Sequence, residues 1–387
     1  MLKRSVSNIS KVLILTGDSQ AYSRRLLQGI AKYNHMHEPW IFYVGDQSLE
    51  TVLPHLRKWQ VSGIIAHMPC AKTAKLIPSN IPCIAIHNRD LITDFPTIVV
   101  DSQQIGKLAA EHFLSSGFHN FAFCGFRDTS WSDSRRNSFV EFITEKKFQV
   151  ATYTEHRKRS EPWWKNTFGH LTEWLEQLPK PVGIFACNDD CGRDISQACK
   201  LVGINIPEQV ALIGVDNDEL VCEFCYPSLS SIHLDAEKAG FEAAELLDSL
   251  MTGKKTKQSL IVVNATHLVQ RRSTDALVFN QSGVANAIKF IRMNAREAIQ
   301  VQDVAEIAAM SRRNIQRVFR KAIGRSVNEE IRHTRVVLIA EMLIKTNMSI
   351  LRIASKFQGL SMAHIARYFR QEKGMSLREY RKKFGQP

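Results

Sequence analysis

Two stretches near the C-terminus decide the fold of that part of the chain. They read Ser311-Arg-Arg-Asn-Ile-Gln-Arg-Val-Phe-Arg-Lys-Ala-Ile-Gly-Arg-Ser326 and Ser361-Met-Ala-His-Ile-Ala-Arg-Tyr-Phe-Arg-Gln-Glu-Lys-Gly-Met-Ser376. Each begins with a serine suited to cap a helix, and each contains Phe-Arg and then Gly-x-Ser. An Ile-Ala pair precedes each stretch, at Ile307 and Ile353, and is expected at a packing seam. The chain therefore repeats one unit, a short helix and a second helix joined by a tight turn.

The second helix of each repeat is predicted to have an apolar face and a polar, mostly basic face. Ile315 and Phe319 are four residues apart in the first copy, as are Ile365 and Phe369 in the second. This pattern is typical of a helix-turn-helix, whose second helix enters the major groove of DNA. Arginine and glutamine read guanine and adenine there, and the remaining basic residues bind phosphate. The residues expected to contact DNA are Ser311, Arg312, Arg313, Gln316, Arg317 and Arg320 in the first copy and Ser361, Met362, His364 and Arg367 in the second.

A third helix is predicted between the repeats, over residues 329–345. A helix of this length spans about 24 Å. It could hold the two recognition helices on one face of DNA, about one helical turn apart.

The charge of the chain supports a polyanionic partner for this region alone. Residues 284–387 contain 21 Lys and Arg against 8 Asp and Glu, which accounts for the whole net charge of +13. Residues 1–283 contain 30 of each and are neutral. A basic module on a neutral body predicts that the module binds nucleic acid and that the body has another role.

Residues 284–383 resemble the double helix-turn-helix domain of the AraC family. The resemblance rests on Ser311-Arg-Arg-Asn, on Arg335 and Ala340 in the linking helix, on Ile350-x-x-Ile-Ala and on Gly374-x-Ser-x-x-x-Tyr-Arg. Three turn positions depart from the family pattern, which usually has an aromatic residue or proline there: Leu360, Val327 and Leu377. The resemblance implies a double-stranded DNA operator or promoter and contact with RNA polymerase.

The neutral body alternates between short apolar runs and amphipathic stretches. This alternation predicts parallel sheets with helices on both faces, and such sheets bind ligands at the carboxyl ends of their strands. The expected strands are Val12–Leu15, Gly63–Ala66, Cys83–Ile86, Ile98–Val100, Phe121–Cys124, Gly183–Ala186 and Val210–Val215. The expected helices are Ala21–Tyr33, Gln103–Ser116, Arg135–Lys147, Gly169–Gln177, Gly192–Val202 and Ala236–Met251.

The body resembles the effector-binding core of lactose-repressor-type regulators and of periplasmic sugar-binding proteins. The resemblance is carried by Asp101 to Phe118, by Arg135-x-x-Ser-Phe, by Ala186-Cys-Asn-Asp, by Ile213-Gly-x-Asp and by Gln270-Arg-Arg-Ser-Thr. Serine stands at position 138, where the family has glycine. The resemblance implies two Rossmann-like lobes crossed by three strands, with a ligand cleft between them.

Positions that match the family predict how a sugar would be held. Arg135 is expected to clamp sugar oxygens, Asp216 to accept hydrogen bonds from two hydroxyls with Asn188 or Asp189 beside it, and Trp131 to stack on a sugar face. From the first lobe we expect Asp18, Tyr22, Arg24 and His67. Each has a structural alternative: Asp216 could cap the following helix, Arg135 could form a surface ion pair, and Trp131 or His67 could belong to the wall.

The predicted architecture is a two-lobed α/β domain followed by an all-α DNA-binding domain. We place the effector domain at residues 1–275, a linker at 276–283 and the double helix-turn-helix domain at 284–387. This order of parts resembles the xylose-responsive regulators of the AraC family, which implies a homodimeric activator of sugar catabolic genes with xylose as effector. His67 stands where those regulators have an acidic residue, which leaves the sugar open. A non-sugar effector or a partner protein is the alternative ligand.

Other classes of protein lack support in the sequence. No GxxxxGK[ST], HExxH, GxSxG or helix-opening GxGxxG motif occurs, so we expect neither an enzyme nor a cofactor. Pro69-Cys70 and Pro82-Cys83 lack the His-Arg that a DNA-repair alkyltransferase needs. The eight cysteines mostly lie in apolar runs and are expected to be reduced, structural and without metal. Without an export signal or a long apolar run, we expect a cytoplasmic protein that does not enter the membrane.

Overall fold

The computed structural model describes residues 9–16, 20–45, 48–68, 71–86, 95–155, 169–254, 260–276 and 282–385. The chain divides into two compact units, one formed by Met1–Gln104 and Leu234–Ala265 and the other by Ile105–His233 and Thr266–Pro387. The chain therefore passes three times from one unit to the other. This agrees with the three crossings that the family resemblance implies.

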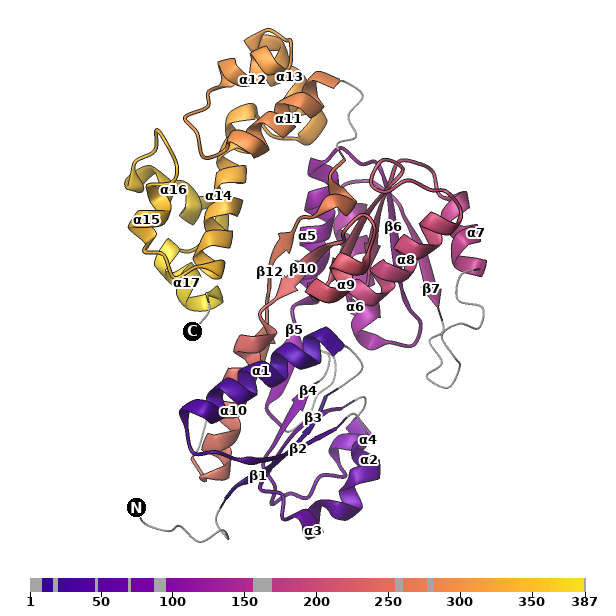
Figure 1. Cartoon of the computed structure of the whole chain (residues 1–387), viewed down its shortest axis with the longest axis vertical. Helices are drawn as coiled ribbons and strands as arrows, with labels where there is room; N and C mark the ends of the chain where they lie inside the picture. Colours follow the sequence, from indigo (N-terminus) through magenta and orange to yellow (C-terminus); the bar gives the residue numbers. More distant parts are fainter. Residues whose placement is uncertain are drawn as a thin grey trace. The chain divides into compact units, whose positions relative to one another are not determined.

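The first unit, lobe 1, is a six-stranded parallel sheet with strand order β11-β5-β4-β3-β1-β2 (Figure 1). Its strands are β1 Lys11–Leu15, β2 Ile41–Gly45, β3 Gly63–His67, β4 Cys83–Ile86, β5 Thr97–Val100 and β11 Leu260–Val263. Its helices are α1 Gln20–Met36, α10 Ala236–Met251 and the short α2 Leu49–Val52, η2 Leu53–His55, α3 Leu56–Trp59 and α4 Ala71–Ala74. Helices α1 and α10 pack closely because Gly29 and Gly240 bring their backbones together, where any Cβ would collide.

The second unit begins with lobe 2, a sheet of the same size with strand order β12-β10-β9-β8-β6-β7. Its strands are β6 Asn120–Phe126, β7 Val150–Glu155, β8 Val182–Ala186, β9 Val210–Val215, β10 Ser230–Leu234 and β12 Ala265–Val269. Its helices are α5 Ser102–Ser115, α6 Ser130–Glu145, α7 Gly169–Gln177, α8 Asp189–Leu201, α9 Glu219–Phe224 and η3 Arg272–Thr274. The pairs β7-β6, β6-β8, β8-β9 and β9-β10 are parallel.

All seven strands predicted from apolar runs are confirmed. Strand β9 shows why they were visible, since every residue of Val210–Val215 is buried, as in a central parallel strand covered on both faces. The strands that the sequence did not predict are β2, β7, β10, β11 and β12, and most of them are edge strands with mixed burial. The predicted helices are confirmed too, although α6 and α8 begin earlier than expected, at Ser130 and Asp189.

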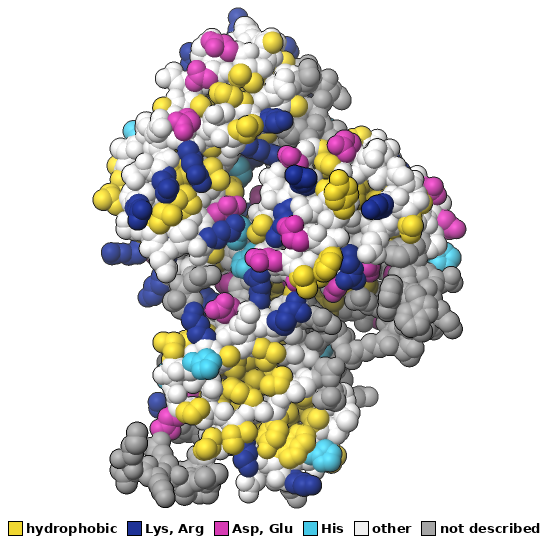
Figure 2. Space-filling view, in the orientation of Figure 1, with side chains coloured by type: hydrophobic (Ala, Val, Ile, Leu, Met, Phe, Trp, Pro, Cys, Tyr) yellow, Lys and Arg dark blue, Asp and Glu magenta, His cyan; other side chains and the backbone are white. Residues whose placement is uncertain are grey.

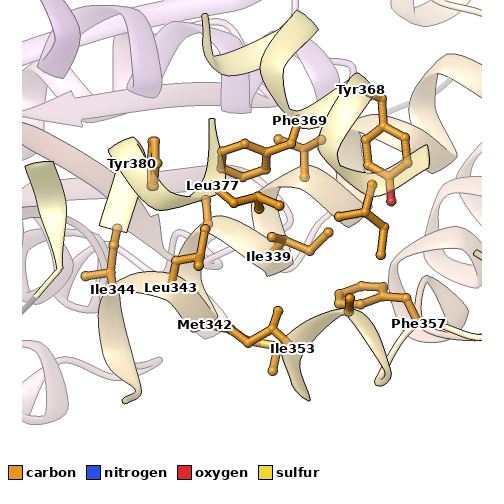
Figure 3. Packing of buried hydrophobic residues seen from close by; sticks show 14 residues of the cluster. Ile339, Met342, Leu343, Ile344, Ile353, Phe357, Tyr368, Phe369, Leu377 and Tyr380 are labelled. Atoms are coloured by element: carbon orange, nitrogen blue, oxygen red, sulfur yellow. The ribbon is translucent and has the colours of Figure 1, made fainter. Parts of the chain in front are cut away.

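The second unit continues into the C-terminal helical domain. Its helices are α11 Ser282–Asn294, α12 Val301–Ile307, α13 Arg312–Ile323, α14 Val327–Lys345, α15 Ile350–Ala354, α16 Met362–Lys373 and α17 Leu377–Phe384. They build two separate hydrophobic cores, one around Ile315 and Phe319 and the other around Ile365 and Phe369. Figure 3 shows the second core, in which Phe369 lies among residues of α14, α15 and α17.

The helix predicted between the repeats is α14, and it is longer than expected. It starts at Val327 rather than at position 329, because Ser326 caps it and Glu329 bonds back to the Ser326 N–H. One packing prediction was wrong: Ile307 is 47% exposed, whereas Ala308 beside it is buried. None of the described helices is long and apolar enough to cross a membrane.

The cysteines of the described residues behave as small hydrophobic side chains. Seven of them are free and buried, in agreement with the structural role predicted for them. Burial raises the pKa of Cys199 and of Cys225 to about 12, so both are neutral thiols at physiological pH.

Candidate functional site

A buried arginine organises the carboxyl end of the lobe 2 sheet. Arg135 lies on α6 and is only 4% exposed. Its Nη1 donates to the backbone oxygen of Cys187, after β8, and its Nη2 lies 3.3 Å from Oδ1 of Asp216, after β9. Its Nε is buried and has no hydrogen-bond partner among the described residues. Because a buried donor without a partner is costly, this atom is suited to bind a ligand oxygen.

The segment that carries Asp216 is held in an unusual backbone conformation. Asp216 and Asn217 have φ values of 99° and 49°, in the left-handed region that residues other than glycine rarely adopt. The conformation is fixed from several sides, because the Asn217 N–H donates to Ser231 Oγ and Arg271 Nη2 donates to Asn217 Oδ1. Such strained residues persist where the surroundings over-determine them, often at ligand sites. The helix cap proposed as an alternative for Asp216 is made by Asp218 instead.

Asp189 supports this segment through two hydrogen bonds. Its Oδ2 accepts the N–H of Asp218 at 2.7 Å, and its Oδ1 accepts from the Ser231 hydroxyl. Burial and the neighbouring Asp216 carboxylate raise the pKa of Asp189 well above its usual value. Gly214 is required here, because a Cβ at this position would overlap Asp189 Oδ1. Both oxygens of Asp189 thus have protein partners, and its geometry is that of a positioning residue.

Asn188 and Trp131 complete the group around Arg135. Asn188 is buried and caps α8 by accepting the N–H of Cys191 at 2.9 Å. Trp131 is half-buried on α6, where its ring lies 5.1 Å from the Arg135 guanidinium carbon and meets Phe126 edge-on. The ring therefore has packing partners and a cation on one side. Arg135, Asn188, Asp189 and Asp216, which the sequence predicted from separate motifs, all gather at this end of the sheet.

The first-lobe candidates lie at the carboxyl end of their own sheet. Tyr22 and Arg24 are in the opening turns of α1, which follows β1, and His67 is the last residue of β3. Strands β1 and β3 are adjacent and parallel, so these residues share one edge. Arg24 and His67 are exposed and Tyr22 is half-buried. Asp18 lies outside the described residues.

The two recognition helices have matching ends. Ser311 caps α13 by accepting the N–H of Asn314, and Ser361 caps α16 by accepting the N–H of His364, both at 3.3 Å. Each helix ends at a left-handed glycine, Gly324 with a φ of 74° or Gly374 with a φ of 70°. The predicted serine caps are therefore confirmed.

The faces of these helices separate as the sequence predicted. Ile315, Phe319, Ile365 and Phe369 are fully buried in the two cores. The proposed DNA contacts are exposed, except for the half-buried Met362: Ser311, Arg312, Arg313, Gln316, Arg317, Arg320, Ser361, His364 and Arg367. Figure 2 shows Lys and Arg side chains over the helices of this domain. Each helix is therefore held by its apolar face, which packs into a hydrophobic core, while its polar face remains in solvent.

The contacts of several supporting residues could not be predicted from the sequence. Arg271 holds the Asp216 segment through Asn217 and the oxygen of Leu229, and Ser231 supports it through Asp189. In the helical domain the buried Arg335 donates to the backbone oxygens of Ala295 and Glu297, which joins α14 to the turn before α12. Two of these residues had a signal in the sequence: Arg335 belongs to the linking-helix motif quoted above, and Arg271 belongs to Gln270-Arg-Arg-Ser-Thr. Neither motif indicated which groups these arginines contact.

Comparisons with known proteins agree with both parts of the chain. Residues 110–274 match the family described as periplasmic binding protein-like domain, and residues 304–383 match a helix-turn-helix domain. The chain joins a periplasmic binding protein-like domain to a helix-turn-helix domain.

Two relatives and one solved structure match nearly the whole chain. The xylose operon regulatory protein of Haemophilus influenzae is 27% identical over 380 residues, covering 96% of this chain and 98% of the relative. The protein of the same name from Escherichia coli K12 is 25% identical, covering 96% of each. A solved xylose-binding transcription activator is 24% identical with a TM-score of 0.61, covering 98% of this chain and all of that one.

Proposed function

We propose that this chain is a sugar-responsive transcriptional regulator that acts in the cytoplasm. Its effector domain binds a sugar, with xylose as the first candidate, and its helix-turn-helix domain binds promoter DNA. The observation that carries the proposal is the buried Arg135–Asp216 pair, in a chain that also presents two exposed recognition helices. The combination of a buried ligand site with DNA-binding helices in one chain supports a role in regulation rather than in catalysis.

The lobe 2 group is chemically suited to a sugar. Hydroxyls both donate and accept, so they need acceptors such as the Asp216 carboxylate and donors such as Arg135 Nε. A buried site that bonds each hydroxyl rejects analogues that lack one, because its own polar groups would then be left unpaired. Asn188 and Trp131 would contact the same sugar, with Asp189 positioning Asp216. Tyr22, Arg24 and His67, together with Asp18, are the contribution we propose for lobe 1.

Regulation would follow from a shift between two conformations of the effector domain. A sugar moves that equilibrium only by its differential affinity for the two forms. We propose that the protein acts as a homodimer on repeated half-sites and that it activates transcription with RNA polymerase. The names of the relatives support xylose as effector. His67, at a usually acidic position, favours the alternative of a different sugar, and a non-sugar effector is the second alternative.

Calorimetric titration of the full chain with xylose and a panel of pentoses and hexoses tests the proposal. We expect micromolar binding of one sugar and loss of that binding in Arg135→Ala. Arg136→Ala is the matched control, because Arg136 lies on the same helix and pairs with Asp133 at the surface. Failure of every sugar to bind would reject the effector, and equal loss in both variants would reject the site.

The DNA part has its own test. Gel-shift titration against selected and random duplexes should show specific binding, and light scattering should show a dimer on the DNA. A monomeric complex, with and without sugar, would refute the dimer.

A further inference from the structure

The two recognition helices can be compared position by position. Residues 311–326 and 361–376 have the same length, the same serine cap distance and the same left-handed glycine at the end. Ile315 and Phe319 fill the first core where Ile365 and Phe369 fill the second. Each residue of α13 therefore has one structural equivalent in α16.

The equivalent positions that face a groove differ in chemistry. Early residues of a recognition helix meet base edges. At these positions α13 carries Arg312, Arg313 and Gln316, all exposed. Their equivalents in α16 are Met362, Ala363 and Ala366. Ala363 is exposed, whereas Met362 and Ala366 are half-buried and pack with one side against the second core. Hydrogen-bonding groups in one helix are thus replaced by apolar groups in the other.

We propose that the second helix-turn-helix unit recognises the C5-methyl group of thymine mainly through the exposed Ala363, with the solvent-exposed part of Met362 beside it. The inference rests on the proposed DNA-binding function and deepens it. The methyl of thymine is the apolar group that base pairs display in the major groove, and alanine is among the side chains that contact it. Arg367 and Arg370, exposed on later turns of α16, would hold phosphates and keep the helix in register. The half of the binding site under α16 accordingly has an A·T pair at each position where a methyl group is contacted.

The test removes methyl groups from the DNA, so it does not depend on how a variant folds. A duplex that binds the full chain is obtained by selection from random sequence. Each thymine is then replaced singly by deoxyuridine, which keeps the base pairing, and affinity is measured by fluorescence anisotropy. We expect about fourfold weaker binding for each contacted methyl, with the sensitive thymines confined to one half of the site.

A protein variant assigns the sensitivity to a residue. Ala363→Gly should bind the normal duplex more weakly and lose the effect of deoxyuridine at one thymine. Arg313→Ala is the control, because it should weaken binding through the other half and leave the deoxyuridine pattern unchanged.

The outcomes distinguish failure of thymine recognition from failure of the proposed DNA-binding function. Specific binding that is indifferent to deoxyuridine, or a sensitivity that survives in both Ala363→Gly and Met362→Ser, overturns thymine recognition and leaves the DNA-binding function intact. Absence of any specific binding overturns both.

Discussion

The two functional regions of the chain use arginine in opposite ways. In lobe 2, Arg135 is almost entirely buried and is bonded to Cys187 and Asp216. On α13, Arg312 and Arg313 are exposed on a helix that only its apolar side holds in place. A small neutral ligand has to be met by groups already taken out of water, where their electrostatic interactions are strong. A polyanion is met by charges that stay in solvent until it arrives.

The largest expected effect comes from a substitution in the hydrophobic core that supports the exposed helix α13. Phe319→Ala opens the first core of the helical domain and should cost about 3–5 kcal/mol of stability there. We expect specific DNA binding to be lost while the calorimetric sugar response of the full chain remains. Ile307→Ala, at a position 47% exposed, should cost much less. Loss of both activities in Phe319→Ala would show that the two regions are not independent.

The buried region should be sensitive to a single charge. Asp216→Asn removes the negative charge that pairs with Arg135 and replaces one of the two carboxylate oxygens that we propose as acceptors for sugar hydroxyls. Because hydrogen bonds to charged groups contribute about 1.5–3 kcal/mol, sugar affinity should fall by about 10- to 100-fold. Calorimetry measures the change, and Asp133→Asn on the surface of α6 is the control. Unchanged sugar affinity in Asp216→Asn would show that the sugar does not contact this carboxylate.

The exposed region should divide into residues that read bases and residues that bind phosphate. Arg313→Ala should cost about 1–3 kcal/mol of discrimination between specific and random DNA if the arginine bonds a base. Lys321→Ala, farther along the exposed face of α13, should weaken both duplexes equally and lower the salt slope by about one. Titrations at several salt concentrations distinguish these effects. If Arg313→Ala weakened binding to specific and random DNA equally, Arg313 would be a phosphate contact.

Near neutral pH the smallest expected effect is the contribution of one buried histidine to the pH dependence of stability. Burial, with a smaller contribution from Arg292, lowers the pKa of His112 on α5 to about 3. The unfolded chain then binds this proton more tightly, so the stability of the folded state falls as pH drops from about 6.5 towards 3. His112→Gln should flatten the fall by up to about 1.4 kcal/mol per pH unit, measured by denaturation at pH 4.5–7. Identical slopes in both proteins would show that His112 titrates normally.

Sequence patterns predicted the helical domain well because its rules are local. Serine caps, left-handed glycines and a four-residue apolar spacing act within one or two turns, so Ser311 and Ser361 could be placed correctly. The prediction that Ile307 is buried was wrong. Ile307 and Ala308 are adjacent apolar residues, so the sequence did not show which of them is buried, and tertiary packing buries Ala308.

The lobe 2 group was predicted in part. Family motifs pointed to Arg135, Asn188, Asp189 and Asp216, and the structure brings all four to one end of the sheet. Their division of labour was not visible in the sequence. Asp189 accepts from Ser231, which is 42 residues away, and Arg271 reaches Asn217 across 54 residues. No spacing rule reports contacts at such separations.

The sequence by itself determined the order of the parts, the repeated helical unit and the location of the positive charge. These follow from periodicity, capping residues and composition, which are properties of neighbouring residues. Tertiary structure decided which charged side chains are buried. It leaves Arg135 with a buried Nε that has no partner among the described residues, and it twists Asp216 into a left-handed conformation. The physical reason is that desolvation depends on everything packed around a group, and most of those neighbours are distant in the chain.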